Sequence, residues 1–111
     1  MEIENTQFKH CDLIKVTGRV DSSTAPRLAE AINNILDAGR FKIVLDLTKL
    51  EFISSAGLRV LISTQKTCKR YNRGEVVIAG MPEYIKSVFD LAGFTPLFRL
   101  FDDSISAVGY F

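Results

Sequence analysis

The chain has 111 residues, of which 47% are hydrophobic and 24% are charged, and its 14 basic and 13 acidic residues leave a formal charge of +1. This length and apolar content predict one domain over residues 1–111 with its own core, and they exclude a disordered segment. The balanced charge argues against direct nucleic-acid binding through a general basic field, and no apolar run approaches the ~20 residues of a membrane-spanning helix.

The predicted elements alternate between strands and helices from the start of the chain. A short β-like run over 13–18 ends at a glycine, and Phe8 belongs to a strand just before it. A polar turn at 21–24 leads into a helix over 26–39, where apolar residues recur at helical spacing between a proline and a closing glycine. The continuous apolar run at 43–47 predicts a strand that is covered on both faces.

The second half of the chain continues this alternation. Its predicted elements are a helix that begins near 54–57 and ends at 72–74, a strand over 76–79, a helix over 82–93, a strand over 97–101 and a terminal helix over 102–108. Gln65 is a polar interruption in the apolar stripe of the first of these helices. The resulting order, β-β-α-β-α-β-α-β-α, is typical of α/β layers in which each helix buries one stripe on a central sheet.

The cysteines and the single histidine point away from metal or redox chemistry. Cys11 and Cys68 are far apart and have no metal-ligand spacing, so we expect two small buried residues in a reducing compartment. His10 beside one cysteine cannot make a tetrahedral metal site. The first residues also lack the apolar run of a signal peptide, and we expect a cytoplasmic protein without a metal or cofactor.

The segment 52–59 carries most of the information about function, because two hydroxyls stand where a strand-like run ends and a helix starts. One interpretation is structural: a serine at this place caps the helix by accepting bonds from free N–H groups. Another is phosphorylation, since a helix N-terminus favours an added phosphate. A serine nucleophile is a third, but it needs a base, only His10 is available, and the GxSxG pattern is absent. We therefore predict no enzymatic activity.

Residues 53–61, Ile-Ser-Ser-Ala-Gly-Leu-Arg-Val-Leu, resemble the signature of STAS domains, named for sulfate transporters and anti-sigma factor antagonists. The resemblance extends to 17–25, to 43–47 and to 88–94, in the family's order and spacing. It implies a STAS-like α/β fold, with a mixed central sheet and helices packed chiefly on one face.

The resemblance also implies a site. Aligned on the glycine and leucine at 57–58, the phosphoacceptor is Ser55, with Ser54 as the alternative because it replaces the aspartate that commonly precedes the acceptor. Asp21 matches an acidic loop residue near the acceptor, and Asp46 a polar position at the end of the central strand. Asp21 could equally make only a turn. The implied partner-binding residues are Asp21, Ser22, Ser23, Thr24, Ser54, Ala56, Gly57 and Arg59.

The implied function is that of an anti-sigma factor antagonist in a partner-switching pathway. The unphosphorylated protein would bind an anti-sigma factor that is also a serine-protein kinase and so free the sigma factor. Phosphorylation would switch it off, and a PP2C-type phosphatase would reverse the mark. ATP belongs to the kinase, so no cofactor is expected. The alternative is a STAS subunit of a lipid or solute transport complex, acting as a non-catalytic interaction module. A nucleotide-binding role lacks a phosphate-cradling glycine loop.

Overall fold

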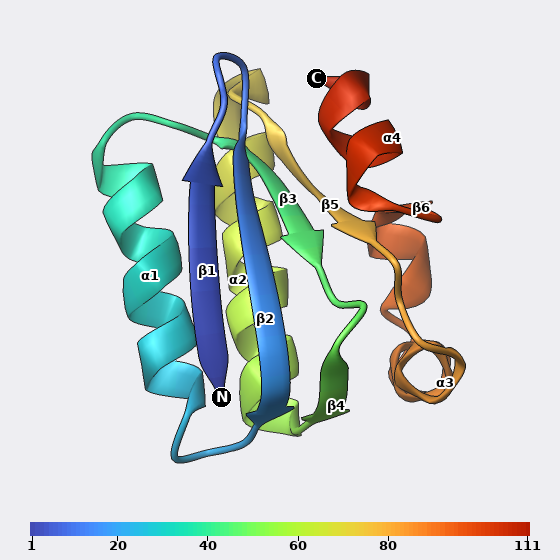
Figure 1. The fold of residues 1–111 in the computed structure, drawn as a ribbon. Coiled ribbons are helices and arrows are strands. Elements are labelled where there is room, and N and C mark those ends of the chain that lie inside the picture. Colours follow the sequence, from blue (N-terminus) through green and yellow to red (C-terminus); the bar gives the residue numbers. More distant parts are fainter.

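A mixed β-sheet with helices on both faces forms the body of the protein (Figure 1). The computed structural model describes residues 1–70 and 72–111 with their side chains. The strands and helices follow in the order β1 (Glu2–Gln7), β2 (Asp12–Val20), α1 (Ala25–Asp37), β3 (Lys42–Asp46), β4 (Leu50–Ile53), α2 (Ser55–Lys69), β5 (Glu75–Ala79), α3 (Glu83–Ala92), β6 (Arg99–Phe101) and α4 (Ser104–Tyr110). Two short 3₁₀ turns, η1 (Arg70–Asn72) and η2 (Thr95–Leu97), precede β5 and β6.

The strand order β1-β2-β3-β5-β6 places the long strand β2 beside three neighbours. β1 runs antiparallel to β2, and the other pairs are parallel. The first half of β2 pairs with β3, and its last residues, 18–20, pair with β4. The pairing shifts register between Gly18 and Arg19, and Gly18 has a φ of +95°. The predicted end of the strand at Gly18 is therefore wrong, because that glycine accommodates an irregularity and the strand continues to Val20.

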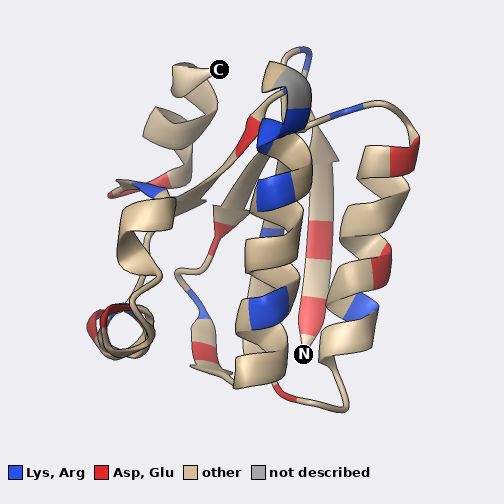
Figure 2. Ribbon diagram, turned by 180° about the vertical axis from the view of Figure 1, so that it is seen from behind, with Lys and Arg blue, Asp and Glu red and all other residues tan. Residues whose placement is uncertain are grey.

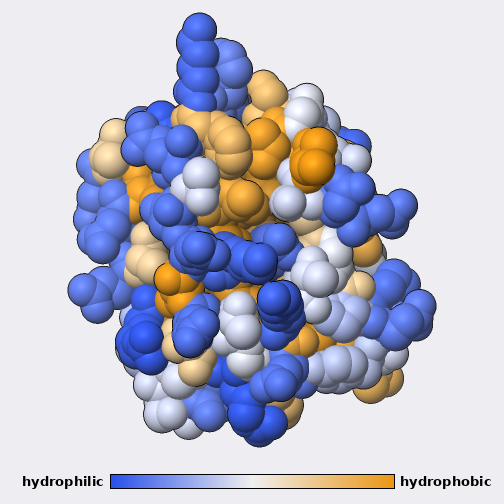
Figure 3. Space-filling view, in the orientation of Figure 1, coloured by the Kyte–Doolittle hydropathy of each residue, from blue (hydrophilic) through white to orange (hydrophobic). Residues whose placement is uncertain are grey.

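The core is divided between the two faces of the sheet. The helices α1, α2 and α3 bury their apolar stripes on one face, which confirms the prediction that helices pack chiefly on one side. The last helix, α4, covers the other face through a smaller cluster around Val44, Val77 and Ala107. In Figure 3, which shows the α4 face, hydrophobic residues remain visible in its upper part; Leu13 and Val108 are partly buried residues of this cluster.

The structure adds one strand to the predicted order and shifts the bounds of the last two predicted elements, the strand over 97–101 and the helix over 102–108. The residues at 52–53 belong to the separate strand β4, which the predicted order omitted because the run is too short to show a period of two. The predicted strand at 97–101 is shorter, since η2 occupies 95–97 and β6 only 99–101. The terminal helix begins at Ser104, where the carboxylate of Asp103 accepts the N–H of Ser106 at 2.8 Å.

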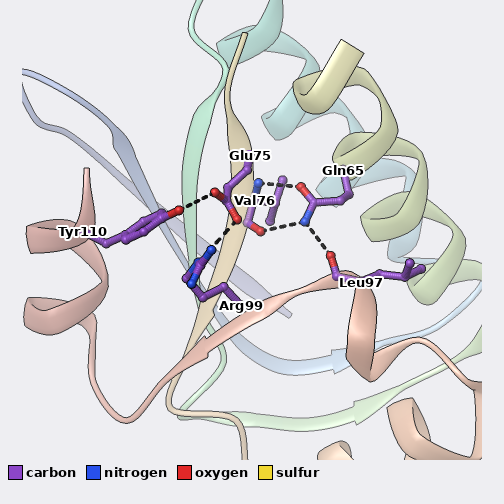
Figure 4. Close-up of polar contacts among 6 residues, drawn as sticks. All are labelled: Gln65, Glu75, Val76, Leu97, Arg99 and Tyr110. Atoms are coloured by element: carbon purple, nitrogen blue, oxygen red, sulfur yellow. Dashed lines mark hydrogen bonds and ion pairs between the residues drawn. The ribbon is translucent and has the colours of Figure 1, made fainter. Parts of the chain in front are cut away.

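Gln65 is buried within the stripe of α2 and connects that helix to the sheet (Figure 4). Its Oε1 accepts the Val76 N–H at 2.7 Å, and its Nε2 donates to the Val76 carbonyl at 3.0 Å and to the Leu97 carbonyl at 2.8 Å. The amide thus occupies the place that a neighbouring strand would take beside Val76. The predicted polar interruption is a hydrogen-bonded link between α2, β5 and the turn before β6.

Both cysteines are buried and unpaired, as predicted. Burial raises the pKa of the Cys68 thiol to about 11, and burial together with the neighbouring Asp12 carboxylate raises the pKa of Cys11. Within residues 1–70 and 72–111 there is no group of three or more residues that could hold a metal ion. No helix in that part of the chain combines the length and the apolar character needed to cross a bilayer.

Candidate interaction and modification site

The two adjacent serines at the start of α2 occupy different structural positions. Ser54 is the N-cap, with extended backbone angles, and its Oγ accepts the Gly57 N–H at 3.4 Å. Its carbonyl accepts the Leu58 N–H at 2.9 Å. The predicted capping role therefore belongs to Ser54, which is half-buried.

Ser55 is the first residue of α2, and it is exposed. Among the hydrogen bonds of the described side chains, none involves the Ser55 hydroxyl. A macromolecular partner can reach this oxygen without disturbing the cap, and the free N–H groups of the first turn favour negative charge beside it.

Gly57 brings the first turn of α2 close to the sheet. A Cβ at this position would lie 2.7 Å from Cγ1 of Val20 and 2.7 Å from Cγ1 of Ile53. Those two residues face each other across the β2–β4 pair. The glycine thus allows the first turn of α2, and with it Ser55, to lie close to the sheet, which is a packing role.

The Asp21 turn is a compact hydrogen-bonded loop before α1. Its Oδ1 accepts the Ser23 N–H at 2.9 Å, the Ser23 hydroxyl at 2.7 Å and the Thr24 N–H at 3.1 Å. The Thr24 hydroxyl accepts the Asp21 N–H at 2.8 Å. The Ser23 hydroxyl, followed by the backbone N–H groups of Thr24 and Ser23, lowers the pKa of Asp21. The predicted turn role of Asp21 is confirmed.

The two halves of the candidate site meet through the backbone. The Ser54 N–H donates to the Val20 carbonyl at 2.8 Å, and Asp21 is the next residue after Val20. The Asp21 turn and the start of α2 therefore lie side by side at the lower end of the molecule in Figure 1. Around them, the other predicted site residues are exposed or half-buried, apart from Gly57, which is buried: Ser22, Ser23, Thr24, Ala56, Gly57 and Arg59.

Sequence reasoning did not identify two aromatic residues close to this surface. The guanidinium of Arg19 lies over the Phe52 ring, 4.4 Å from its centroid, and these residues face each other across β2 and β4. The Tyr84 hydroxyl on α3 donates to the Leu50 carbonyl at 3.0 Å, which attaches α3 to β4. The pairing of β2 with β4 brings Arg19 and Phe52 together, and the contact of α3 with β4 places Tyr84 near them; no local sequence pattern reveals either arrangement.

Other candidates have structural roles or lie elsewhere. Asp46 accepts the N–H and the hydroxyl of Thr48, at 3.0 and 2.6 Å, and so shapes the β3–β4 turn. The basic residues of α2 lie on its exposed outer face (Figure 2). His10 lies in the β1–β2 turn at the opposite end of the molecule from Ser55, so the serine-nucleophile hypothesis is wrong. The candidate site therefore consists of the exposed Ser55 hydroxyl and the Asp21 turn, which lie on one accessible surface.

Comparison with known proteins shows which family the sequence matches. The model of the STAS domain matches residues 2–107 of the chain. BtrV of Bordetella bronchiseptica, named as a candidate anti-sigma factor antagonist, is 33% identical over 94 residues, which cover 85% of this chain and 80% of BtrV. The anti-sigma-B factor antagonist of Listeria monocytogenes is 26% identical over 100 residues, covering 90% of this chain and 86% of that protein.

A solved structure shares the fold. SpoIIAA, a Bacillus cell fate determinant whose structure was solved in its phosphorylated form, superimposes with a TM-score of 0.78 at 14% identity. The match covers 98% of this chain and 98% of SpoIIAA. The mixed sheet with helices chiefly on one face is thus the arrangement found in SpoIIAA, in agreement with the fold expected from the sequence.

Proposed function

The chain belongs to the STAS domain family, and on that premise we propose that it is an anti-sigma factor antagonist switched by phosphorylation of Ser55. Its unphosphorylated form binds an anti-sigma factor that is also a serine-protein kinase and thereby frees the sigma factor in the cytoplasm. A PP2C-type phosphatase restores the binding form. The protein itself acts by binding and not by catalysis, as the names of its relatives indicate.

The observation that carries the proposal is the contrast between the two serines. A kinase needs a hydroxyl that it can reach and that is free to attack the γ-phosphate of ATP. The Ser55 side chain is exposed, whereas the Ser54 hydroxyl is half-buried and caps the helix. A related fold, that of SpoIIAA, exists in a phosphorylated form.

The physical basis of the switch is local. A phosphoserine carries about −1.5 to −2 charges at neutral pH. On Ser55 that charge would stand beside the Asp21 turn, on the surface that a partner has to cover and desolvate. Every ~1.4 kcal/mol of lost binding free energy weakens affinity tenfold, so ~3–4 kcal/mol gives a switch of two to three decades. The phosphate needs no change of fold to act, because the N-cap is on the neighbouring residue.

The names of the relatives favour this role over the transport-subunit alternative, since BtrV and the Listeria monocytogenes protein are both named as antagonists of anti-sigma factors. The test is a binding measurement between the purified chain and the anti-sigma kinase of the same organism, with ADP and then with ATP. We expect a stable complex with ADP, its loss after incubation with ATP, and phosphate on the peptide that contains Ser55. No complex in either nucleotide would contradict the proposal, and phosphate on Ser54 alone would overturn the site.

We expect Asp21→Asn to weaken kinase binding or slow phosphorylation while the fold stays intact. Asparagine keeps the size of the side chain and one acceptor oxygen for the turn, so the substitution tests charge more than shape. Because the folded pKa of Asp21 is lowered, the turn's stabilising effect is present above the unfolded value of ~3.9 and is lost only as the pH falls through the folded pKa. The carboxylate is therefore ionised throughout the neutral range.

The measurement compares kinase affinity, phosphorylation rate and melting temperature for the wild type, Asp21→Asn and Glu2→Gln. The control removes one carboxylate from β1, outside the candidate site. Equal affinities and rates in all three proteins would mean that Asp21 only shapes the turn.

A further inference from the structure

A second cluster of side chains, most of them basic, lies at the end of the molecule opposite Ser55. There the β1–β2 turn, the loop between α1 and β3, and the segment between α2 and β5 come together (Figure 1). Figure 2 shows basic residues on each of these segments and along the last turns of α2. A helix of 15 residues, about 22 Å long, separates this end from the phosphorylation site.

Two adjacent hollows shape this surface. The first has a volume of about 220 Å³ and lies between the β1–β2 turn and the α1–β3 loop; the second has about 580 Å³ and lies between the end of α2 and the end of α4. Lys42 and Arg73 line both, so the hollows share a wall. We call this surface the basic end; its lysines and arginines are Lys9, Arg40, Lys42, Lys69 and Arg73, and His10 lines the first hollow beside them.

The charge of the basic end is far from that of the whole protein. Among the described residues that line the hollows, five are lysines or arginines and one has an acidic side chain, Glu75, although the chain as a whole has a charge of +1. Glu75 is already engaged, because it accepts the Tyr110 hydroxyl at 2.7 Å and lies 3.9 Å from Nε of Arg99 (Figure 4). Among the ion pairs of the described side chains, none involves Lys9, Lys42 or Lys69.

The segments that carry these charges are held together by internal contacts. Arg40 pairs with the buried carboxylate of Asp12 and donates to the carbonyls of Phe8, at 2.6 Å, and Cys11, at 3.1 Å. A Cβ on Gly74 would lie only 2.1 Å from the Phe41 carbonyl oxygen, so the α2–β5 segment packs directly on the α1–β3 loop. The hollows are therefore parts of one preorganised surface, which reduces the entropy lost on binding.

The shape and the aromatic residues of the basic end select one class of partner. The surface is concave, so a flat membrane would reach its rim and not its walls. Arginines already lie over two of its aromatic rings: the guanidinium of Arg73 lies 5.1 Å from the Phe41 centroid, and that of Arg99 lies 4.7 Å from the Tyr110 centroid. A nucleic-acid base would have to compete with these guanidinium groups for the ring faces that they cover.

We propose that the basic end binds an acidic segment of a partner protein, through aspartate and glutamate side chains that enter the two hollows. Carboxylates on a flexible chain can reach separate lysines in a concave site, and charge complementarity of this kind accelerates and orients association. Because this surface and Ser55 lie at opposite ends of α2, the acidic segment can remain bound whether Ser55 is phosphorylated or not.

The test uses a fluorescein-labelled oligoglutamate peptide and fluorescence anisotropy at low and physiological salt. We expect binding that weakens with salt, since the Debye length falls to about 8 Å at 0.15 M. The double variant Lys42→Glu/Lys69→Glu should weaken it by about tenfold or more. Lys49→Glu/Lys86→Glu is the matched control, because it changes the net charge by the same amount away from the hollows; there we expect affinity within about twofold of the wild type.

Equal weakening by both double variants would overturn the proposal, because it would show a response to net charge alone. Tighter binding of single-stranded RNA or of phosphatidylserine vesicles than of the peptide, with the same dependence on Lys42 and Lys69, would assign the surface to another class of partner. If the charge-reversed variant fails to fold, amide chemical shifts of the wild type during peptide titration decide: changes at Ser55 and none at Lys9, Lys42 and Lys69 would contradict the site.

Discussion

Ser55→Ala is expected to abolish phosphate incorporation by the cognate kinase and to leave a protein that binds that kinase with either nucleotide. The substitution removes the proposed acceptor oxygen and nothing that the fold requires, because the helix cap is the hydroxyl of Ser54. Alanine is also the best helix former at this exposed first-turn position. With ATP present, we therefore expect the variant to bind the kinase two to three orders of magnitude more tightly than the phosphorylated wild type does.

Ser54→Ala is the matched control for this prediction. It removes the N-cap, which costs about 1 kcal/mol, and a domain with ~5–15 kcal/mol of stability survives that loss. We expect it to melt at a lower temperature and still to be phosphorylated. Mass mapping of both variants after incubation with kinase and ATP makes the comparison. If Ser55→Ala still accepts phosphate, or if Ser54→Ala alone does not, the assignment of the two serines has to be reversed.

Gln65→Leu is expected to cost the largest amount of folding free energy, about 3–5 kcal/mol, without touching the candidate site. Leucine has a similar size but leaves the Val76 N–H and the carbonyls of Val76 and Leu97 without their amide partner. Each buried polar group that loses its partner costs about 1–3 kcal/mol, partly offset by the gain in apolar burial. Equilibrium unfolding in urea measures the loss as a fall in the midpoint at an unchanged slope.

Thr64→Val is the control for Gln65, since it changes the neighbouring buried polar residue of the same helix. The Thr64 hydroxyl donates only to the Val60 carbonyl at 2.7 Å, within α2 itself. That carbonyl keeps its helical N–H partner when the hydroxyl is removed, so we expect a cost of about 1 kcal/mol or less. Comparable losses for both variants would mean that the link between α2 and β5 adds nothing beyond ordinary burial.

The order of the main elements follows from local patterns, because helices with apolar stripes and continuous apolar strands are visible in short windows of sequence. What local patterns miss is how strands meet. Gly18 is a typical strand end, yet its partner in β4, Leu50, lies 32 residues later in the chain, and the strand continues through the irregular pairing to Val20. Gln65 likewise has a polar side chain in an apolar stripe, and its purpose appears only once β5 lies beside it.

The sequence predicted which residues belong to the candidate site, but it did not predict which of the two serines caps the helix. Resemblance to the STAS family singled out both serines and Asp21, and the fold brings these residues to one surface. The sequence alone cannot assign the cap, because either serine satisfies the preference for a small hydroxyl residue at a helix start. The assignment to Ser54 depends on its extended backbone angles and on its bond to the Val20 carbonyl, which are long-range features of the β2–α2 contact.

The ends of the strand order bear on how the protein behaves at high concentration. An unpaired strand edge is a template on which other chains can add and aggregate. Here one end of the strand order is β1, where Glu2 and Glu4 are exposed, and the other is β6, which has only three residues and begins one residue after the proline-containing turn η2. Charge at one edge and brevity at the other both oppose strand addition between copies. Under the proposed function, phosphorylation would then set the supply of the protein to its partners without competition from strand addition between copies.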